Sequence, residues 1–222
     1  MEDVAKMTAW IDASCILIVF FALAMLATHR LIGVIQLFAA QAFVLGFVPF
    51  FLHAHDLSGR DITLALGTLV LKAGLVPYIL FWARRRVSMR SEIKPIIGVG
   101  ASLIFGALLI AGAFWVSLSL KLPGKPLSDL ILPCSLATVL LGFMIMVTRT
   151  LAVAQVLGYL MMENGIFLFG LSLFDAMPVI MEMGILLDIF VAVFIMAIVV
   201  NHINEAFERS PGSNRGKMGE SG

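Results

Sequence analysis

Seven stretches of this 222-residue chain are long and apolar enough to cross a bilayer as helices, and they leave room for little else. A helix needs about 20 apolar residues to cross a hydrocarbon core about 30 Å thick. The stretches are continuous apolar runs and not short segments of alternating polarity, which favours helices over a membrane barrel. We therefore predict an all-α, polytopic integral membrane protein with seven transmembrane helices, at residues 10–28, 31–52, 61–83, 96–118, 128–147, 151–174 and 179–200.

The composition agrees with a chain that lives in lipid. It is 61% hydrophobic and 13% charged with a mean hydropathy of +1.05, whereas a soluble domain is about half apolar and about a quarter charged. Glu2 and Asp3 precede the first run where a secretory signal would have basic residues, so we expect a retained first helix. Because the seven runs use nearly the whole chain, no soluble catalytic domain fits.

Loops and tail divide the chain into four parts. The loop KLPGKP, residues 121–126, separates four helices from three. We expect an N-terminal four-helix membrane half (1–118), a connecting loop (119–127), a C-terminal three-helix membrane half (128–200) and a mobile cytoplasmic tail (201–222) that is rich in serine, glycine and charge. Helices one to three and five to seven would share an orientation, which predicts a parallel repeat with helix four as the connector.

Basic residues decide which way the chain faces, because cytoplasmic loops are enriched in Lys and Arg. One side of the predicted membrane collects ten of them: Arg30, Arg84, Arg85, Arg86, Arg90, Lys94, Arg149, Arg209, Arg215 and Lys217. The other side has four: Lys6, Arg60, Lys121 and Lys125. We predict an N terminus outside and a cytoplasmic C terminus.

Few residues have the chemistry of a cofactor site. The two cysteines, Cys15 and Cys134, lie inside predicted helices and form no metal-binding motif. His53 and His55 fit solvated loop residues better than a metal site. Gly98 to Gly100 form a GVG sequence inside a predicted membrane helix, where we expect close helix packing and not a dinucleotide site. We expect no cofactor, no bound metal, no catalytic residue and no nucleic-acid partner.

Three ionisable residues lie in the middle of predicted spans: Lys72, Glu163 and Asp188. A charge at the centre of a spanning helix costs about 2.5–3.5 kcal/mol on insertion scales, so such residues face protein or water and mark candidate functional sites. Gln41 and Lys72 occupy helices two and three much as Glu163 and Asp188 occupy helices six and seven. We predict a proton relay of Glu163, Asp188 and Lys72, supported by three further polar residues: Gln41, Asn164 and Glu182.

The surroundings of the two acids suit proton exchange. Gly165 leaves room beside Glu163 for water or a neighbouring helix, and Asp188 lies in the apolar sequence GILLDIFVAVF, where burial favours the neutral acid. Glu182, near the outer surface, is either an entry group or a solvated helix end. An alternative for the set is a static salt bridge from Lys72 to Glu163 or Asp188 that only pins the helices together.

The segment VLGYLMMENGIFL, followed about 25 residues later by GILLDIFVAVFIMAIV, resembles the membrane protein family known as hydrogenase-4 component E. RLIGVIQLFAAQAFVL and LVLKAGLVPYILFWARRR resemble the early helices of that family, so the resemblance covers nearly the whole chain. The family's C-terminal helices are in turn similar to the small K-type protein of respiratory complex I and the small C-type protein of multisubunit sodium/proton antiporters. The resemblance implies that Glu163 and Asp188 are the intramembrane carboxylates of a lateral proton path, although the K-type protein places its asparagine about a turn after the acid and here Asn164 is adjacent.

The resemblance implies a non-redox membrane subunit of an energy-converting hydrogenase or formate hydrogenlyase-type complex in a prokaryotic cell (inner) membrane. Its expected partners are the lipid bilayer and other membrane subunits, and the chain would contribute a proton or sodium relay without performing the redox step. Two alternatives stay open at this stage: a subunit of a multisubunit cation/proton antiporter, and a passive membrane scaffold.

Overall fold

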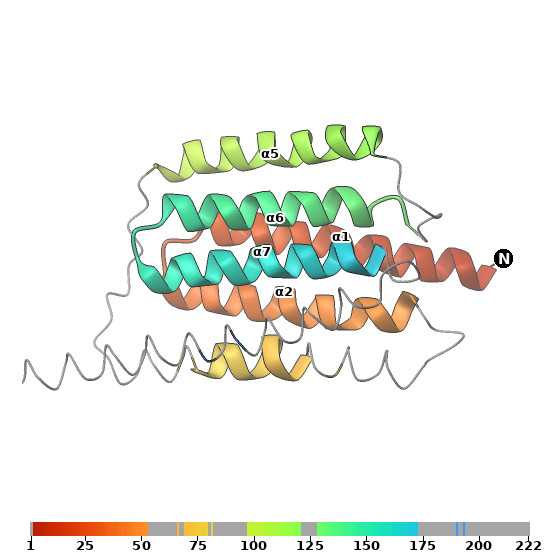
Figure 1. Ribbon diagram of the computed structural model, residues 1–222, viewed down its shortest axis with the longest axis horizontal. Helices are drawn as coiled ribbons and strands as arrows, with labels where there is room; N and C mark the ends of the chain where they lie inside the picture. The colour runs from red at the N-terminus through yellow and green to blue at the C-terminus, as the bar shows by residue number, and fades with distance from the viewer. Residues whose placement is uncertain are drawn as a thin grey trace, which may run out of the picture.

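The computed structural model describes residues 2–52, 66, 69–79, 81, 97–120, 128–172, 190 and 193. Its elements are α1 (Glu2–Ala27), α2 (Leu31–Leu52), the short π-helix η1 (Leu69–Leu75), α5 (Val99–Ser119), α6 (Ile131–Thr148) and α7 (Ala152–Ser172) (Figure 1). Five helices in this part of the chain are long and apolar enough to cross a membrane. The all-α, multi-pass prediction is confirmed. Most of 61–83 and of 179–200 lies outside the described residues, so seven spans and the repeat stay predictions.

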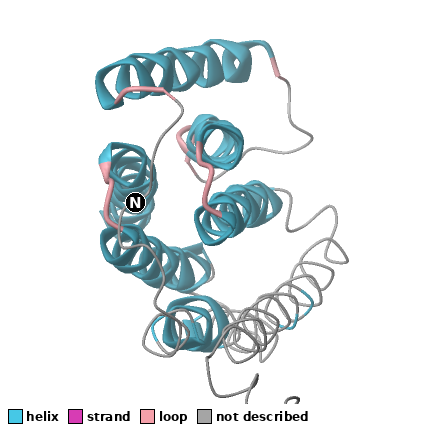
Figure 2. Ribbon diagram, turned by 90° about the vertical axis from the view of Figure 1, so that its left-hand side faces the viewer, coloured by secondary structure: helices cyan, strands magenta, loops and turns pink. Residues whose placement is uncertain are grey.

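Four helices, α1, α2, α7 and α6, form a closed ring. The pairs α1 and α2, α2 and α7, α7 and α6, and α6 and α1 are all in contact, with α6 and α7 packed most extensively. α1 and α6 run in one direction while α2, α5 and α7 run in the other (Figure 1). Seen end-on, α5 covers α6 and α1 on one side of the ring, and η1 packs on α2 on the opposite side (Figure 2).

Glycines allow α6 and α7 to approach closely. A Cβ added at Gly142 on α6 would lie 2.5 Å from the backbone nitrogen of Met162, and one added at Gly158 on α7 would lie 2.8 Å from the backbone nitrogen of Met146. Small residues bring backbones together in this way in membrane helices, where lipid provides no hydrophobic drive for association. Gly142 and Gly158 therefore set the position of α7, the helix that holds Glu163 and Asn164.

The glycines of the GVG sequence have no packing partner among the residues that the structure describes. A Cβ added at Gly98 or Gly100 would meet nothing within 4 Å in the described part of the chain. Gly98 is instead the residue that precedes the first turn of α5, and its carbonyl accepts a hydrogen bond from the backbone N–H of Ser102 at 2.9 Å. Close packing of these glycines is thus not seen among the described residues, and it stays a prediction for the rest of the chain.

The beginning of α6 is fixed to α1 by a side-chain bridge. The hydroxyl of Ser128 donates a hydrogen bond to Asp12 Oδ1, and the backbone N–H of Leu130 donates to Ser128 Oγ at 3.1 Å. The second bond satisfies one of the N–H groups that a helix start leaves without an intrahelical partner. The bridge holds the first and fifth predicted spans together at one end of the ring.

Two apolar cores fill the ring, one toward each end. The first includes Phe38 of α2 and Met161 of α7, and the second includes Leu45 of α2 and Phe167 of α7. Between these positions α2 carries Gln41, and α7 carries Glu163 and Asn164. These three buried polar residues therefore lie in one layer between the two apolar cores.

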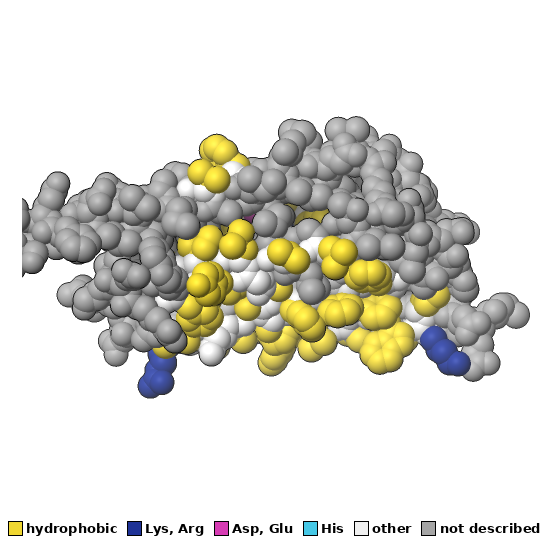
Figure 3. All heavy atoms as spheres, turned by 90° about the horizontal axis from the view of Figure 1, so that it is seen from below, with side chains coloured by type: hydrophobic (Ala, Val, Ile, Leu, Met, Phe, Trp, Pro, Cys, Tyr) yellow, Lys and Arg dark blue, Asp and Glu magenta, His cyan; other side chains and the backbone are white. Residues whose placement is uncertain are grey.

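The outside of the described helices is apolar, as a lipid-facing surface must be. Large hydrophobic side chains such as Trp115 and Leu118 of α5 are 74% and 85% exposed. Seen from below, hydrophobic side chains cover much of the described surface, and the Lys and Arg side chains in view lie toward its two ends (Figure 3). This distribution matches a body that crosses the hydrocarbon layer and places its cations at the interfaces.

Candidate functional site: a buried ion pair between two apolar cores

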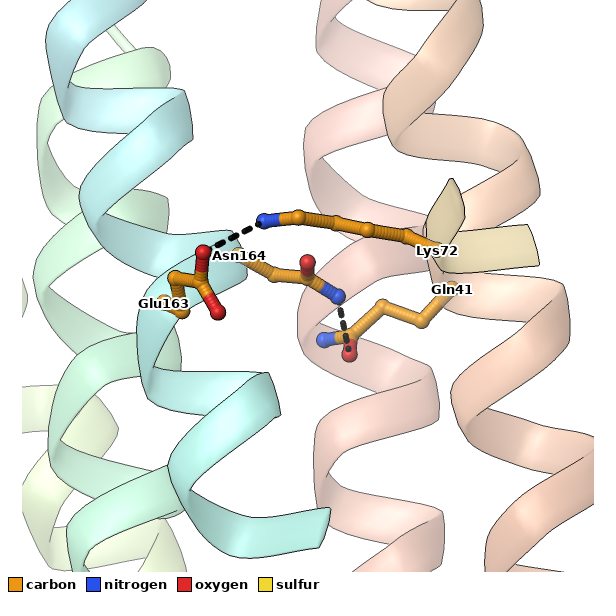
Figure 4. A network of polar contacts seen from close by, with 4 residues as sticks. All are labelled: Gln41, Lys72, Glu163 and Asn164. Carbon is orange, nitrogen blue, oxygen red and sulfur yellow. Dashed lines mark hydrogen bonds and ion pairs between the residues drawn. The ribbon is translucent and has the colours of Figure 1, made fainter. Parts of the chain in front are cut away.

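An ion pair between Lys72 of η1 and Glu163 of α7 lies at the centre of the polar layer. Lys72 Nζ is 3.5 Å from Glu163 Oε1, and the two side chains are 1% and 4% exposed (Figure 4). Charge-assisted hydrogen bonds are shorter, about 2.7–2.9 Å. At 3.5 Å the two groups attract each other as charges, and proton exchange between them requires a closer approach or a bridging water.

The aromatic ring of Phe167 is a second neighbour of the ammonium group. Lys72 Nζ is 5.6 Å from the centroid of this ring, within the distance at which a cation is attracted to the face of an aromatic side chain. Phe167 follows Glu163 by four residues on α7, so both side chains lie on the same face of the helix. One face of α7 therefore supplies both the carboxylate and the ring that hold the ammonium.

The backbone around Lys72 has an unusual form. Leu69–Leu75 is a π-helix, a wide turn that is rare and is often found at functional sites. Pro77 follows closely in the sequence and lacks an N–H group, so it cannot complete a regular α-helical ladder. The π-helix thus presents Lys72 from a segment whose backbone departs from the regular helices of the ring.

An amide pair lies beside the ion pair. Asn164 Nδ2 donates to Gln41 Oε1 at 3.4 Å, and Gln41 Nε2 donates to the backbone carbonyl of Ile18 on α1 at 3.0 Å. Both amides are fully buried, and Asn164 Oδ1 has no hydrogen-bond partner among the described residues. The pair connects α7, α2 and α1 in the layer that also holds Glu163 (Figure 4).

The ion pair adds little net stability to the fold, but each of its two charges needs the other. Two unit charges 3.5 Å apart attract each other by about 5 kcal/mol at an effective dielectric constant of about 20. Removing each ion from water costs several kcal/mol, so attraction and desolvation nearly offset each other. Losing one partner is therefore far more costly than losing both.

The structure brings together four of the six polar residues that the sequence singled out: Gln41, Lys72, Glu163 and Asn164. Asp188 and Glu182 lie outside the described residues, as do His53 and His55. Gly165 leaves its space to a neighbouring helix, since a Cβ there would lie 2.8 Å from the backbone nitrogen of Val139 on α6. The relay role itself stays a prediction.

Sequence reasoning missed two contributors to this layer. Phe167 could have been found from its spacing of four residues after Glu163. The carbonyl of Ile18 gave no signal, because it is a backbone group in an apolar run. Cys15 of α1 and Cys134 of α6 are free, buried thiols in the same apolar core.

Arg149 behaves differently from the loop cation that the sequence indicated. It directly follows the last residue of α6, is 2% exposed, and donates from Nη2 to the carbonyl of Leu26 near the end of α1. Burial lowers the pKa of this guanidinium from its ordinary value. A cation is favourable at this position, because helix C termini carry partial negative charge.

The fold and the site define a multi-pass membrane protein with an ion pair buried between two apolar cores. Comparison with known proteins shows that the chain is 28% identical to an uncharacterized protein of Mycobacterium tuberculosis over 179 residues, 79% of this chain and 80% of the relative. It is 29% identical to hydrogenase-4 component E of Escherichia coli K12 over 134 residues, 60% of this chain and 62% of the relative, and equally similar to that of Shigella flexneri. The alignment thus spans less than two thirds of hydrogenase-4 component E. No family model matches the chain, and no solved structure matches it significantly.

Proposed function

We propose that this chain is a non-redox membrane subunit of an energy-converting hydrogenase or formate hydrogenlyase-type complex. In it, Glu163 and Asp188 exchange protons (or sodium ions) within the membrane, and Lys72 tunes their charge. The similarity to hydrogenase-4 component E supports the type of complex. The proposed kinship with the K-type protein of complex I and the C-type protein of the antiporters supports the lateral direction of the path.

The observation that carries the relay is the Lys72–Glu163 pair, 3.5 Å apart and buried between two apolar cores. A carboxyl group that lies next to an ammonium group can take its proton and return it, because the pair is neutral overall in both forms. The amide of Asn164 beside the acid is polar without being charged, so it can hydrogen-bond to a water or to the carboxyl group in either form.

The test is a comparison of variants in the complex that copurifies with the full chain. Glu163→Gln keeps the shape of the side chain and removes its ability to titrate. We expect the purified complex to retain its hydrogen or formate chemistry, since this chain performs no redox step, and to lose proton movement into liposomes followed with a pH-sensitive dye. Asp129→Asn makes the same chemical change at an exposed position before α6 and is the matched control.

Two outcomes would contradict the proposal. The relay fails if the Glu163→Gln complex assembles with all its subunits and moves protons as fast as the Asp129→Asn complex. The assignment to a hydrogenase complex fails if the subunits that copurify include no hydrogenase and consist of antiporter subunits, which would support the cation/proton antiporter instead.

A passive scaffold is a second candidate, and the ion pair itself favours it. Lys72 and Glu163 join η1 to α7, as a purely structural salt bridge would. In that role the double variant Lys72→Met, Glu163→Gln would assemble normally, because both charges are gone, and would move protons at the wild-type rate. The relay predicts normal assembly with proton movement lost.

A further inference from the structure

We infer that Lys72 decides which ion the site exchanges: its ammonium group takes the place beside Glu163 that a metal cation would need, so the site exchanges H⁺ and rejects Na⁺. This inference rests on the proposed function and narrows its substrate to one of two ions. Lys72 is then a residue that determines ion specificity.

The oxygen atoms of the polar layer are of the kind that bind hard cations. Glu163 supplies a carboxylate, and Asn164 Oδ1 and Gln41 Oε1 are amide carbonyl oxygens in the same buried layer. Carboxylate and carbonyl oxygens are the ligands that hard metal ions prefer. Gln41 is fixed with its oxygen toward Asn164, because its nitrogen donates to the carbonyl of Ile18. Without Lys72, this group of oxygens would suit Na⁺.

The ammonium group of Lys72 already places a positive charge beside these oxygen atoms. Its Nζ is 3.5 Å from Glu163 Oε1 and 5.6 Å from the centre of the Phe167 ring, and the residue is 1% exposed. A metal ion on the same oxygen would lie no more than about 6 Å from Nζ, the 3.5 Å of the ion pair plus the roughly 2.3–2.6 Å of a metal–oxygen bond. Two cations that close in a buried site repel each other strongly.

Charge balance separates transfer of a proton within the pair from binding of Na⁺. Lys72 and Glu163 form a neutral pair, and adding Na⁺ would leave a net positive charge between two apolar cores. Moving a proton within the pair adds no charge. One N–H bond of the ammonium breaks and leaves its electron pair on nitrogen, while an O–H bond forms on the carboxylate, which gives a neutral amine and a neutral acid. No oxidant or reductant takes part.

The experiment follows protonation of Glu163 by infrared spectroscopy in the full chain, purified with the subunits that accompany it. The carbonyl band of the protonated acid is assigned by its absence from Glu163→Gln. Its titration is recorded in NaCl and in N-methylglucamine chloride. The variants are Lys72→Met, which removes the charge at similar length, Lys72→Gln as a polar second version, and Lys72→Arg as the control that keeps a cation.

In the wild type and in Lys72→Arg we expect the same titration midpoint in both salts. In Lys72→Met and Lys72→Gln we expect Na⁺ to compete with H⁺, so that the midpoint falls by about one pH unit for each tenfold rise in Na⁺ above its dissociation constant. A wild-type midpoint that moves with Na⁺ overturns the inference, as does a midpoint in both neutral variants that ignores Na⁺.

These outcomes are distinct from failure of the relay. If the wild type shows no band that Glu163→Gln removes, at any pH at which the complex is intact, the acid does not titrate and the proposed function fails with the inference. If the band titrates and follows Na⁺ in the wild type, Glu163 is an exchanging group and the assigned selectivity alone is wrong.

Discussion

Gly142→Ala is the substitution that most directly tests how α7 is positioned. The new Cβ would lie 2.5 Å from the backbone nitrogen of Met162, 2.7 Å from the carbonyl oxygen of Gly158 and 2.9 Å from Met162 Cα. These are backbone atoms, so no side-chain rotation can relieve the overlap. Ordinary contact begins at 3.4 Å, and the difference from 2.5 Å means that α7 must move away by about 0.9 Å.

The expected cost follows from two opposing terms. Overpacking costs about 1–3 kcal/mol, while alanine in place of glycine in a helix contributes up to about 1 kcal/mol in the opposite direction. We therefore expect a net loss of up to about 3 kcal/mol, measured as the free energy of unfolding in mixed micelles by circular dichroism. Proton movement should change as well, because a displacement of α7 away from α6 alters the distance between Glu163 and Lys72.

Gly112→Ala is the matched control. Gly112 lies in α5, where an added Cβ meets no described residue within 4 Å, so the substitution should leave stability unchanged or raise it by up to about 1 kcal/mol. If Gly142→Ala is as stable as Gly112→Ala and moves protons normally, close backbone packing does not set the position of α7, and the reasoning from these contacts is refuted.

Three further predictions concern the buried polar groups, each measured by the same unfolding assay. Glu163→Gln or Lys72→Met alone should lower the free energy of unfolding by about 3–5 kcal/mol, and the double variant should lower it much less. Equal losses in all three variants would show that the two charges do not stabilise each other. Arg149→Ala should cost about 1–3 kcal/mol by removing the donor to the carbonyl of Leu26, with Arg149→Lys intermediate, and a neutral result would mean that the buried guanidinium contributes nothing. Gln41→Leu should cost about 1 kcal/mol through the lost bond to the α1 backbone, and an unchanged or increased stability would speak against that bond.

Much of the fold could be predicted from the sequence because lipid allows few alternatives. A segment in the hydrocarbon layer must satisfy its own backbone, so an apolar run becomes a helix over nearly its full length. The run at 151–174 became α7 at Ala152–Ser172, and the run at 96–118 became α5 at Val99–Ser119. The first helix starts earlier than the apolar run, at Glu2, because polar residues can continue a helix into water.

The site could be predicted in part. Position along a span gives depth, which is why residues from three separate segments meet in one layer. Depth does not say which helices are neighbours, so the sequence left Lys72 with two candidate partners, and the structure pairs it with Glu163. The burial of Arg149 could not be predicted either, because the sequence does not distinguish a buried arginine between two helix ends from an exposed one in a cytoplasmic loop.

The ion pair also has a consequence for how the protein is made. Ribosomes synthesise the chain from its N terminus, so Lys72 reaches the membrane well before α7, which carries Glu163, has been translated. Until then the η1 segment offers the insertion machinery a lysine without its carboxylate, which slows its partition into lipid. Insertion of α6 and α7 would supply that carboxylate. In variants of Glu163 the lysine never gains this partner, so we expect the newly synthesised chains to be degraded faster by membrane proteases.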